Sequence, residues 1–267
     1  MRGGLGLYAR YIGISVRGQM AYRGSFIMLS LGGFAITAIE FATIWLLYQH
    51  FGGIAGWSLA QIGLMYGMVN ISFAVADAFA RGFDQFSGMV KSGDFDRVLL
   101  RPRGTALQIV GQKLELQRIG RLSQAVVVLV VSAVNIGVVW TPGRLLLLLL
   151  AMLGGACLFI GIAILQATAS FWTTESLEIF NTFTNGGVAT TEYPLPIYAR
   201  WLQRFFTYVV PLAATTYFPA MAIMGRDDPL GSTVLFQYLA PLIGIAFPIL
   251  CLQIWKIGVR HYKSTGT

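Results

Sequence analysis

Long apolar segments recur along the 267-residue sequence, and they restrict the fold more than any other feature. Five of them cover roughly residues 25–48, 58–80, 122–140, 145–171 and 233–255. A membrane-spanning helix needs about 20 consecutive apolar residues, which is about the length of each segment. Only 11% of the residues are charged, whereas soluble domains carry about a quarter. We therefore expect an all-α polytopic membrane protein in which residues 1–267 form a single transmembrane domain.

A sixth membrane crossing is expected within residues 172–230, where two interpretations are open. In the first, residues 176–192 span the membrane and residues 194–224 form a re-entrant hairpin at the outer face. In the second, residues 173–200 are a cytoplasmic loop and residues 201–224 span. Hydropathy favours the second interpretation, and so do Arg200 and Arg204, which the first places outside. Both interpretations give six transmembrane helices.

The distribution of Lys and Arg predicts the orientation of the chain. The formal net charge of +8 invites a nucleic-acid partner, but enrichment of Lys and Arg in cytoplasmic segments explains it better, and we expect no nucleic acid. Under the first interpretation, fifteen of the nineteen Lys and Arg are cytoplasmic when both termini lie inside. Residues 1–24 place apolar side chains at helical spacing, which predicts an amphipathic interfacial helix on membrane lipid.

A basic island, residues 81–121, separates the second and third apolar segments and holds eight Lys and Arg. The rest of the chain is mostly apolar, so this island is the natural place for a soluble partner to dock. We expect that partner to be a motor protein. Phe95 lies between two aspartates in this island, and an aromatic side chain in that position fits a groove of the partner. The alternative is that Phe95 packs under the membrane domain of its own chain.

Ionisable and polar residues inside the apolar segments mark a candidate translocation path, because such residues are costly in lipid. Glu40 lies in the first span and Asp77 near the inner end of the second. Asn70 of the second span would form a polar stripe with Asn181 and Asn185 of the fifth. The alternatives are carboxylates that pair with arginines such as Arg81 and Arg121, and plain hydrogen bonds between helices.

The sequence lacks the motifs of nucleotide hydrolysis and of metal binding. No Gly-x-x-x-x-Gly-Lys-Ser/Thr phosphate loop occurs, so we expect no ATP hydrolysis, no catalytic residue and no cofactor in this chain. His50 and His261 have no neighbouring ligands in the sequence, so no metal site is expected. An alternative function is an ion-coupled secondary transporter using Glu40 and Asp77, or a channel-like pore.

Several motifs, in order along nearly the whole chain, resemble those of ABC-2 type permeases, the six-span membrane subunits of ABC exporters. The most specific follows the second span and reads Gly93-Asp94-Phe95-Asp96-Arg97-Val98-Leu99-Leu100-Arg101-Pro102, with Val98 where the pattern has Leu. Other matches are Tyr22-Arg23-Gly24, Phe171-Trp172-Thr173-Thr174-Glu175, Tyr193-Pro194, Tyr217-Phe218-Pro219 and the segment from Gly258 to Gly266.

The resemblance implies a half-transporter in the cell inner membrane. Two such permease subunits, identical or related, would pair with two ATP-binding subunits that carry the ATP and Mg. The island would supply a coupling helix, with Phe83, Phe86, Phe95 and Leu99 as anchors and Arg97 and Arg101 as ionic contacts. Gly93, Asp94, Asp96 and Pro102 would complete this coupling segment. The resemblance also implies a short fifth helix followed by a re-entrant outer hairpin. The transported substrate stays open.

Overall fold

The computed structural model describes residues 4–53, 56–173 and 176–262, without the side chains of residues 4–5, 7, 9–10 and 176–183. Every regular element within these ranges is a helix. Five helices in the described part are long and apolar enough to cross a membrane. A sixth crossing exists if a bent pair of short helices counts as one span. The prediction of an all-α polytopic membrane protein is confirmed.

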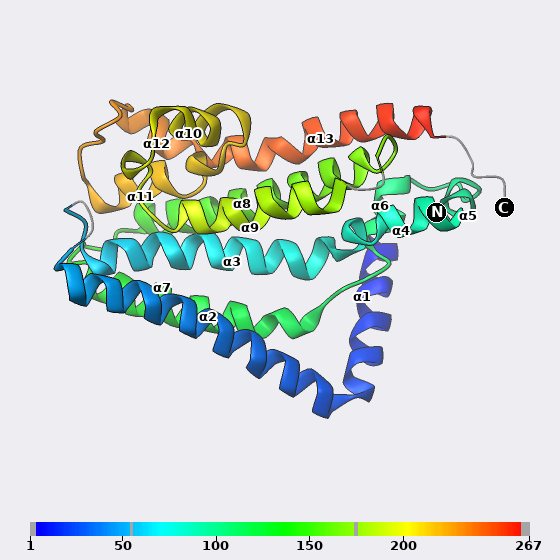
Figure 1. Cartoon of the computed structure of the whole chain (residues 1–267), viewed down its shortest axis with the longest axis horizontal. Helices are drawn as coiled ribbons and strands as arrows, with labels where there is room; N and C mark the ends of the chain where they lie inside the picture. Colours follow the sequence, from blue (N-terminus) through cyan, green and yellow to red (C-terminus); the bar gives the residue numbers. More distant parts are fainter. Residues whose placement is uncertain (1–3, 54–55, 174–175, 263–267) are drawn as a thin grey trace.

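The long helices run side by side along the long axis of the molecule (Figure 1). They are α2 (Arg23–Phe51), α3 (Leu59–Asp84), α7 (Ile119–Asn135), α8 (Pro142–Ala169) and α13 (Pro241–His261), joined by the shorter α9 (Ser176–Thr191). Helix α3 is central, because it packs against α7, α8 and α9 and residues 62–70 are all buried. Helix α1 (Gly4–Ala21) lies nearly perpendicular to this bundle, as the expected interfacial helix would.

Short elements gather at the two ends of the bundle (Figure 1). The end that carries α1 also holds α4 (Phe86–Ser92), α5 (Phe95–Leu99), α6 (Thr105–Val110) and η1 (Leu116–Arg118). The opposite end holds η2 (Leu195–Ile197), α10 (Arg200–Arg204), η3 (Phe205–Val209), η4 (Leu212–Ala214), α11 (Tyr217–Met224) and α12 (Val234–Leu239). The predicted single coupling helix is thus three short helices, α4 to α6.

The segment after α9 is broken and deeply packed. The helical stretches 200–209 and 212–224 meet at an angle of 74°. Residues 211–223 are all buried, although they include two prolines that interrupt helical hydrogen bonding. Irregular backbone at membrane depth is tolerated only where protein covers it. Here α8, α12 and α3 pack against α11 and provide that cover.

Two predicted spans end differently in the structure. The third was expected to reach Trp140, but α7 stops at Asn135 because Gly137 has φ of +74°, which breaks a right-handed helix. The indole of Trp140 then folds back and donates to the Ala133 carbonyl over 2.9 Å. The last span was expected as one helix from residue 233. It is divided into α12 and α13, and Pro241 begins α13.

Glycines of α3 allow α7 to approach closely, as the Gly63–Gly67 spacing indicates. A β-carbon added at Gly67 would lie 2.7 Å from the β-carbon of Leu129 and 2.9 Å from its α-carbon. A β-carbon at Gly63 would collide with the hydroxyl of Ser132. At these two glycines the helices meet by close packing.

Replacing Gly67 should therefore destabilise the bundle. Gly67→Ala forces Leu129 and its backbone away from α3, and overpacking of this kind costs about 1–3 kcal/mol. Thermal unfolding of the purified protein in detergent measures the loss. Gly88→Ala is the matched control, because a β-carbon at Gly88 meets nothing within 4 Å. Equal melting temperatures for the two variants would contradict the close contact.

Candidate functional site

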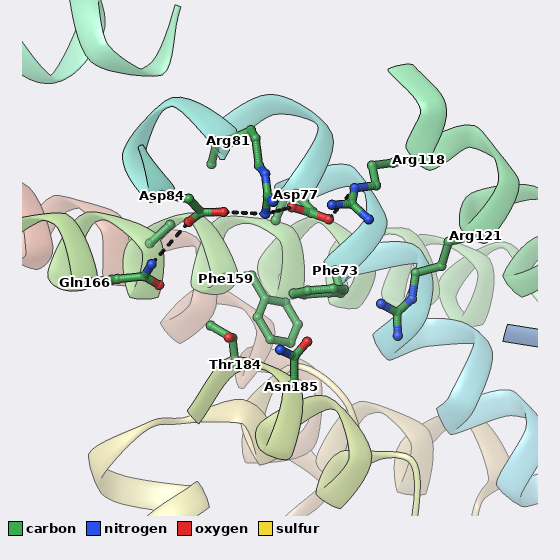
Figure 2. A pocket seen from close by; sticks show the side chains of 13 residues that line it. Phe73, Asp77, Arg81, Asp84, Arg118, Arg121, Phe159, Gln166, Thr184 and Asn185 are labelled. Carbon is green, nitrogen blue, oxygen red and sulfur yellow. Dashed lines mark hydrogen bonds and ion pairs between the residues drawn. The ribbon is translucent and has the colours of Figure 1, made fainter. Parts of the chain in front are cut away.

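A polar cavity of about 270 Å³ opens between α3, α8, α9 and the start of α7. Figure 2 shows ion pairs along one side of it and α9 on the other, with Phe73 and Phe159 between them. The charged and polar residues that line it are Asp77, Arg81, Asp84, Arg118, Arg121, Gln166, Thr184 and Asn185. Such a lining can hold a solute with polar or charged groups more readily than a purely apolar one.

The carboxylates of α3 that line this cavity form ion pairs with arginines. Asp77, whose side chain is only 9% exposed, lies 2.7 Å from Arg118 and 3.4 Å from Arg81. Arg81 in turn lies 2.6 Å from Asp84, and Gln166 of α8 donates to the other oxygen of Asp84 over 3.4 Å. These pairs connect three parts of the chain: α3, α8 and residues 111–118, the segment between α6 and α7 that we call the strap.

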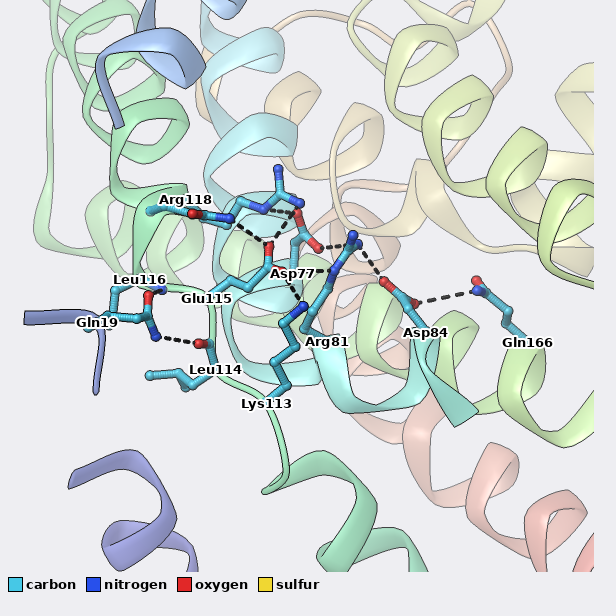
Figure 3. A network of polar contacts seen from close by, with 11 residues as sticks. Gln19, Asp77, Arg81, Asp84, Lys113, Leu114, Glu115, Leu116, Arg118 and Gln166 are labelled. Carbon is cyan, nitrogen blue, oxygen red and sulfur yellow. Dashed lines mark hydrogen bonds and ion pairs between the residues drawn. The ribbon is translucent and has the colours of Figure 1, made fainter. Parts of the chain in front are cut away.

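Glu115 extends the charged network beyond the membrane-spanning helices (Figure 3). Burial alone would raise the pKa of this carboxyl. The hydrogen bond from Lys113 and the guanidinium charges of Arg81 and Arg118 outweigh burial, so the pKa of Glu115 is lowered. The closest contacts are 3.1 Å to Lys113 and 3.1 Å to Arg118. Glu115 therefore stays ionised and holds both arginines beside the cavity.

Helix α1 is hydrogen-bonded to the same strap through Gln19. The amide nitrogen of Gln19 donates to the Leu114 carbonyl over 2.6 Å, and its oxygen accepts from the Leu116 backbone amide over 2.9 Å (Figure 3). Farther along α1, the Tyr8 hydroxyl donates to the Phe79 carbonyl over 3.2 Å. Helix α1 is thus fixed both to the strap beside Glu115 and to α3.

A second polar group lies deeper in the bundle. Asn70 is fully buried, donates to Glu192 over 2.9 Å and accepts from the Arg121 guanidinium over 3.1 Å. Arg121 also lies 3.9 Å from Glu40 of α2. This chain of contacts connects α2, α3, α7 and the turn that follows α9.

The predicted path residues fall into two sets. Asp77 and Asn185 line the same cavity, whereas Glu40 and Asn70 meet through Arg121. The side chain of Asn181 lies outside the described residues. Asp77 lies beside Arg81 and Arg118, and Glu40 lies 3.9 Å from Arg121, so both carboxylates have the arginine neighbours that the pairing alternative expected. Sequence reasoning missed Glu192, and its position directly before Tyr193-Pro194 was the available signal.

The island residues Phe83, Phe86 and Phe95 form an aromatic cluster with Phe171, Trp255 and Tyr262. Phe86 and Phe95 are completely buried and Phe83 nearly so. Ring centroids lie 5.0 Å apart for Phe86 and Phe95, 4.9 Å for Phe86 and Trp255, and 5.0 Å for Phe95 and Tyr262. The Trp255 indole also donates to Thr105 of α6 over 2.9 Å. The cluster fixes α4, α5 and α6 on the C-terminal end of α13.

This burial corrects the predicted docking anchors. A side chain with no exposed surface cannot enter a partner's groove, so Phe83, Phe86 and Phe95 support the segment from beneath, as the alternative for Phe95 had it. The exposed residues of the segment include Leu99 at 41%, Leu100 at 85%, and Arg97, Arg101, Pro102 and Arg103. Leu100 is the most exposed apolar side chain of the segment, and it was not among the predicted anchors.

Local bonds shape the exposed face of the segment. Gly93 has φ of +74° and ends α4, which turns the chain into α5. Asp94 accepts from the Ser92 hydroxyl over 2.7 Å and lies 3.3 Å from the largely exposed Arg97, while Asp96 is half-buried. Gln108 donates to the carbonyls of Val98 and Arg103, which closes the loop that presents Leu100 and Arg101.

Comparison with known proteins decides the family. The sequence model of one family, described as ABC-2 family transporter protein, matches residues 34–266, which is most of the chain. The chain belongs to the ABC-2 transporter family. No curated protein and no solved structure matched it. As a member of this family it is a multi-pass membrane permease of an ABC transporter, a class in which a partner subunit is the ATPase.

Removing one partner from the cavity network should destabilise the permease. Arg118→Met leaves the buried Asp77 carboxylate with only the longer contact to Arg81. Breaking a buried pair costs about 3–5 kcal/mol, and because Arg118 is a third exposed we expect about 1–3 kcal/mol. Unfolding in detergent measures the loss. The double variant Arg118→Met with Asp77→Leu should recover most of it, and additive losses would contradict direct pairing.

Proposed function

We propose that this ABC-2 permease is the membrane half of an exporter and that a separate ATPase drives it. Two copies, or this chain and a related one, pair with two ATP-binding subunits in the cytoplasmic membrane. ATP closure of the motor moves α4 to α6, and the permease halves then switch access to the polar cavity. Asp77, Asn70, Asn185 and Glu40 are proposed to border the path, and Asn181 lies on the same helix as Asn185.

The observation that carries this proposal is the α4–α6 segment itself. It exposes an apolar side chain, Leu100, together with Arg97, Arg101 and Arg103. An apolar centre with charged residues near it is the composition found at protein interfaces. Beneath this face, the aromatic cluster connects the segment to α13. A force applied to Leu100 is therefore passed to a membrane-spanning helix through packed rings.

The motor also has a direct connection to the cavity. Helix α6 packs against α3, and the chain continues from α6 through Lys113 and Glu115 to the arginines that border the cavity. A displacement of α6 thus changes the position of Arg81 and Arg118, which hold Asp77. This gives the proposed coupling both an apolar route, to α13, and a charged route, to the cavity.

We propose an orientation with both termini inside and residues 194–224 as a re-entrant outer hairpin. Supporting it, α10, α11 and α12 all lie at the end of the bundle opposite α4–α6, while α9 runs along α8 (Figure 1). A spanning segment from residue 201 would instead have to begin at the α4–α6 end. Arg226 also contacts the first turn of α3, since its guanidinium donates to Gln61 over 2.8 Å.

Docking and support can be separated by two substitutions. Leu100→Ser should leave the melting temperature unchanged but weaken recovery of the co-expressed ATPase by about 1–2 kcal/mol, because Leu100 is exposed. Phe95→Ala empties a fully buried site, which costs about 3–5 kcal/mol, and should lower the melting temperature as well as transport. Leu230→Ser, an exposed leucine at the opposite end, is the control. Undiminished ATPase recovery with Leu100→Ser would refute the docking face.

Labelling tests the orientation. In a variant with Cys157 and Cys251 replaced, single cysteines at the exposed positions Arg103, Arg200 and Asp227 are treated in intact cells with an impermeant thiol reagent. We expect labelling at 200 and 227 and protection at 103. Protection at 200 with labelling at 227 would instead establish the cytoplasmic loop followed by a span.

A further inference from the structure

A groove of about 300 Å³ lies between α2 and the strap that enters α7. It shares Glu40 with the proposed path but is separate from the polar cavity between α3, α8 and α9. Its floor contains Gly32 and Gly33, its apolar wall is formed by residues such as Met28 and Ile36, and its polar residues include Glu40 and Arg121. A β-carbon at Gly32 would meet nothing within 4 Å, so the groove is open at this point. We name it the α2–α7 groove.

The groove opens toward lipid. Helix α2 is long and apolar enough to cross a membrane, yet only 11% of its most apolar 18-residue stretch is buried by the rest of the chain. Met28 is 76% exposed and Ile36 61%. Exposed apolar side chains on a membrane-spanning helix contact acyl chains, so a chain that follows α2 enters the groove beside Gly32 without crossing any polar surface.

The charges in the groove have an unusual arrangement. Glu40 is 46% exposed in its side chain, and its contact with Arg121 is long, at 3.9 Å. A carboxylate that faces lipid is costly unless a cation accompanies it. Arg118, the other arginine of the groove, lies 2.7 Å from Asp77 and 3.1 Å from Glu115. Arg121 also contacts Asn70 and stacks over Phe73, which fixes its guanidinium at the polar end of the groove.

We propose that the α2–α7 groove binds one zwitterionic phospholipid of the bilayer, with its phosphate on Arg121 and its ammonium group on Glu40. The pair Glu40 and Arg121 has no net charge, and a head group with one anion and one cation complements both members. An anionic lipid would satisfy Arg121 but would leave Glu40 without a cation.

Native mass spectrometry of the purified permease in detergent tests this without any ATPase, so its result is independent of the proposed transport function. Phosphatidylethanolamine, phosphatidylglycerol and diacylglycerol with the same acyl chains are the probes. We expect one phosphatidylethanolamine per chain, retained about tenfold better than phosphatidylglycerol, as one charged hydrogen bond provides. Diacylglycerol should be retained least.

Gly32→Leu adds a side chain at a groove residue where a β-carbon meets nothing within 4 Å, and it should lower phosphatidylethanolamine retention about tenfold. Gly24→Leu is its matched control on the same helix, since a β-carbon there also meets nothing within 4 Å. Glu40→Gln should reverse the preference toward phosphatidylglycerol, and Glu40→Asp should restore it. Elution volume and melting temperature verify that each variant is folded.

Three results would overturn the proposal. The first is unchanged retention in Gly32→Leu. The second is a lipid preference that Glu40→Gln does not alter. The third is a change of oligomeric state in Gly32→Leu at constant lipid retention, which would assign the groove to a second copy of the chain. As a second readout, added phosphatidylethanolamine should raise the melting temperature of the parent chain and not that of Gly32→Leu.

Discussion

Inside a bilayer no water is available for backbone amides and carbonyls, and the rest of this structure depends on that constraint. It confines the lipid-facing parts of the permease to long helices, each of which satisfies its own backbone hydrogen bonds. It also explains where the irregular backbone lies. The broken segment from Pro211 to Ile223 is fully buried under neighbouring helices, and the short helices α4 to α6 lie at the end of the bundle.

Charged side chains obey the same constraint, and their pairing builds the cavity. Asp77 and Asp84 of α3 are each within reach of Arg81, and Arg118 from another segment joins Asp77. Pairs between segments resist separation because either partner left alone in a low-dielectric site is costly. The network therefore maintains a polar space in an otherwise apolar bundle, and through Glu115 it connects that space to the strap between α6 and α7.

The apolar segments were predictable because length and hydropathy act locally. Helices α2, α3 and α8 begin and end within a few residues of their expected positions. The end of α7 was not predictable, because it depends on the conformation of Gly137 and on a fold-back of Trp140.

The role of Phe95 was harder to predict, since aromatic residues in a polar loop suit a partner's groove and an internal cluster equally well. Its burial depends on Trp255 and Tyr262, more than 150 residues later in the chain. Glu192 was missed for the same reason: only the fold brings it to Asn70. The surroundings of Phe95 and Glu192 thus depend on contacts with residues distant in sequence, which local patterns do not reveal.

The clasp between Gln19 and the strap at Leu114 and Leu116 has a geometric consequence. Because the amide uses both its donor and its acceptor on one short stretch, α1 and that strap move together. In the orientation proposed above, α1 lies between the head groups and the hydrocarbon of the inner leaflet, which would then set the height of the proposed docking face above the bilayer. Membranes of different thickness would then change the surroundings of the broken segment at the opposite end, while a partner bound at the proposed docking face would stay at a constant height.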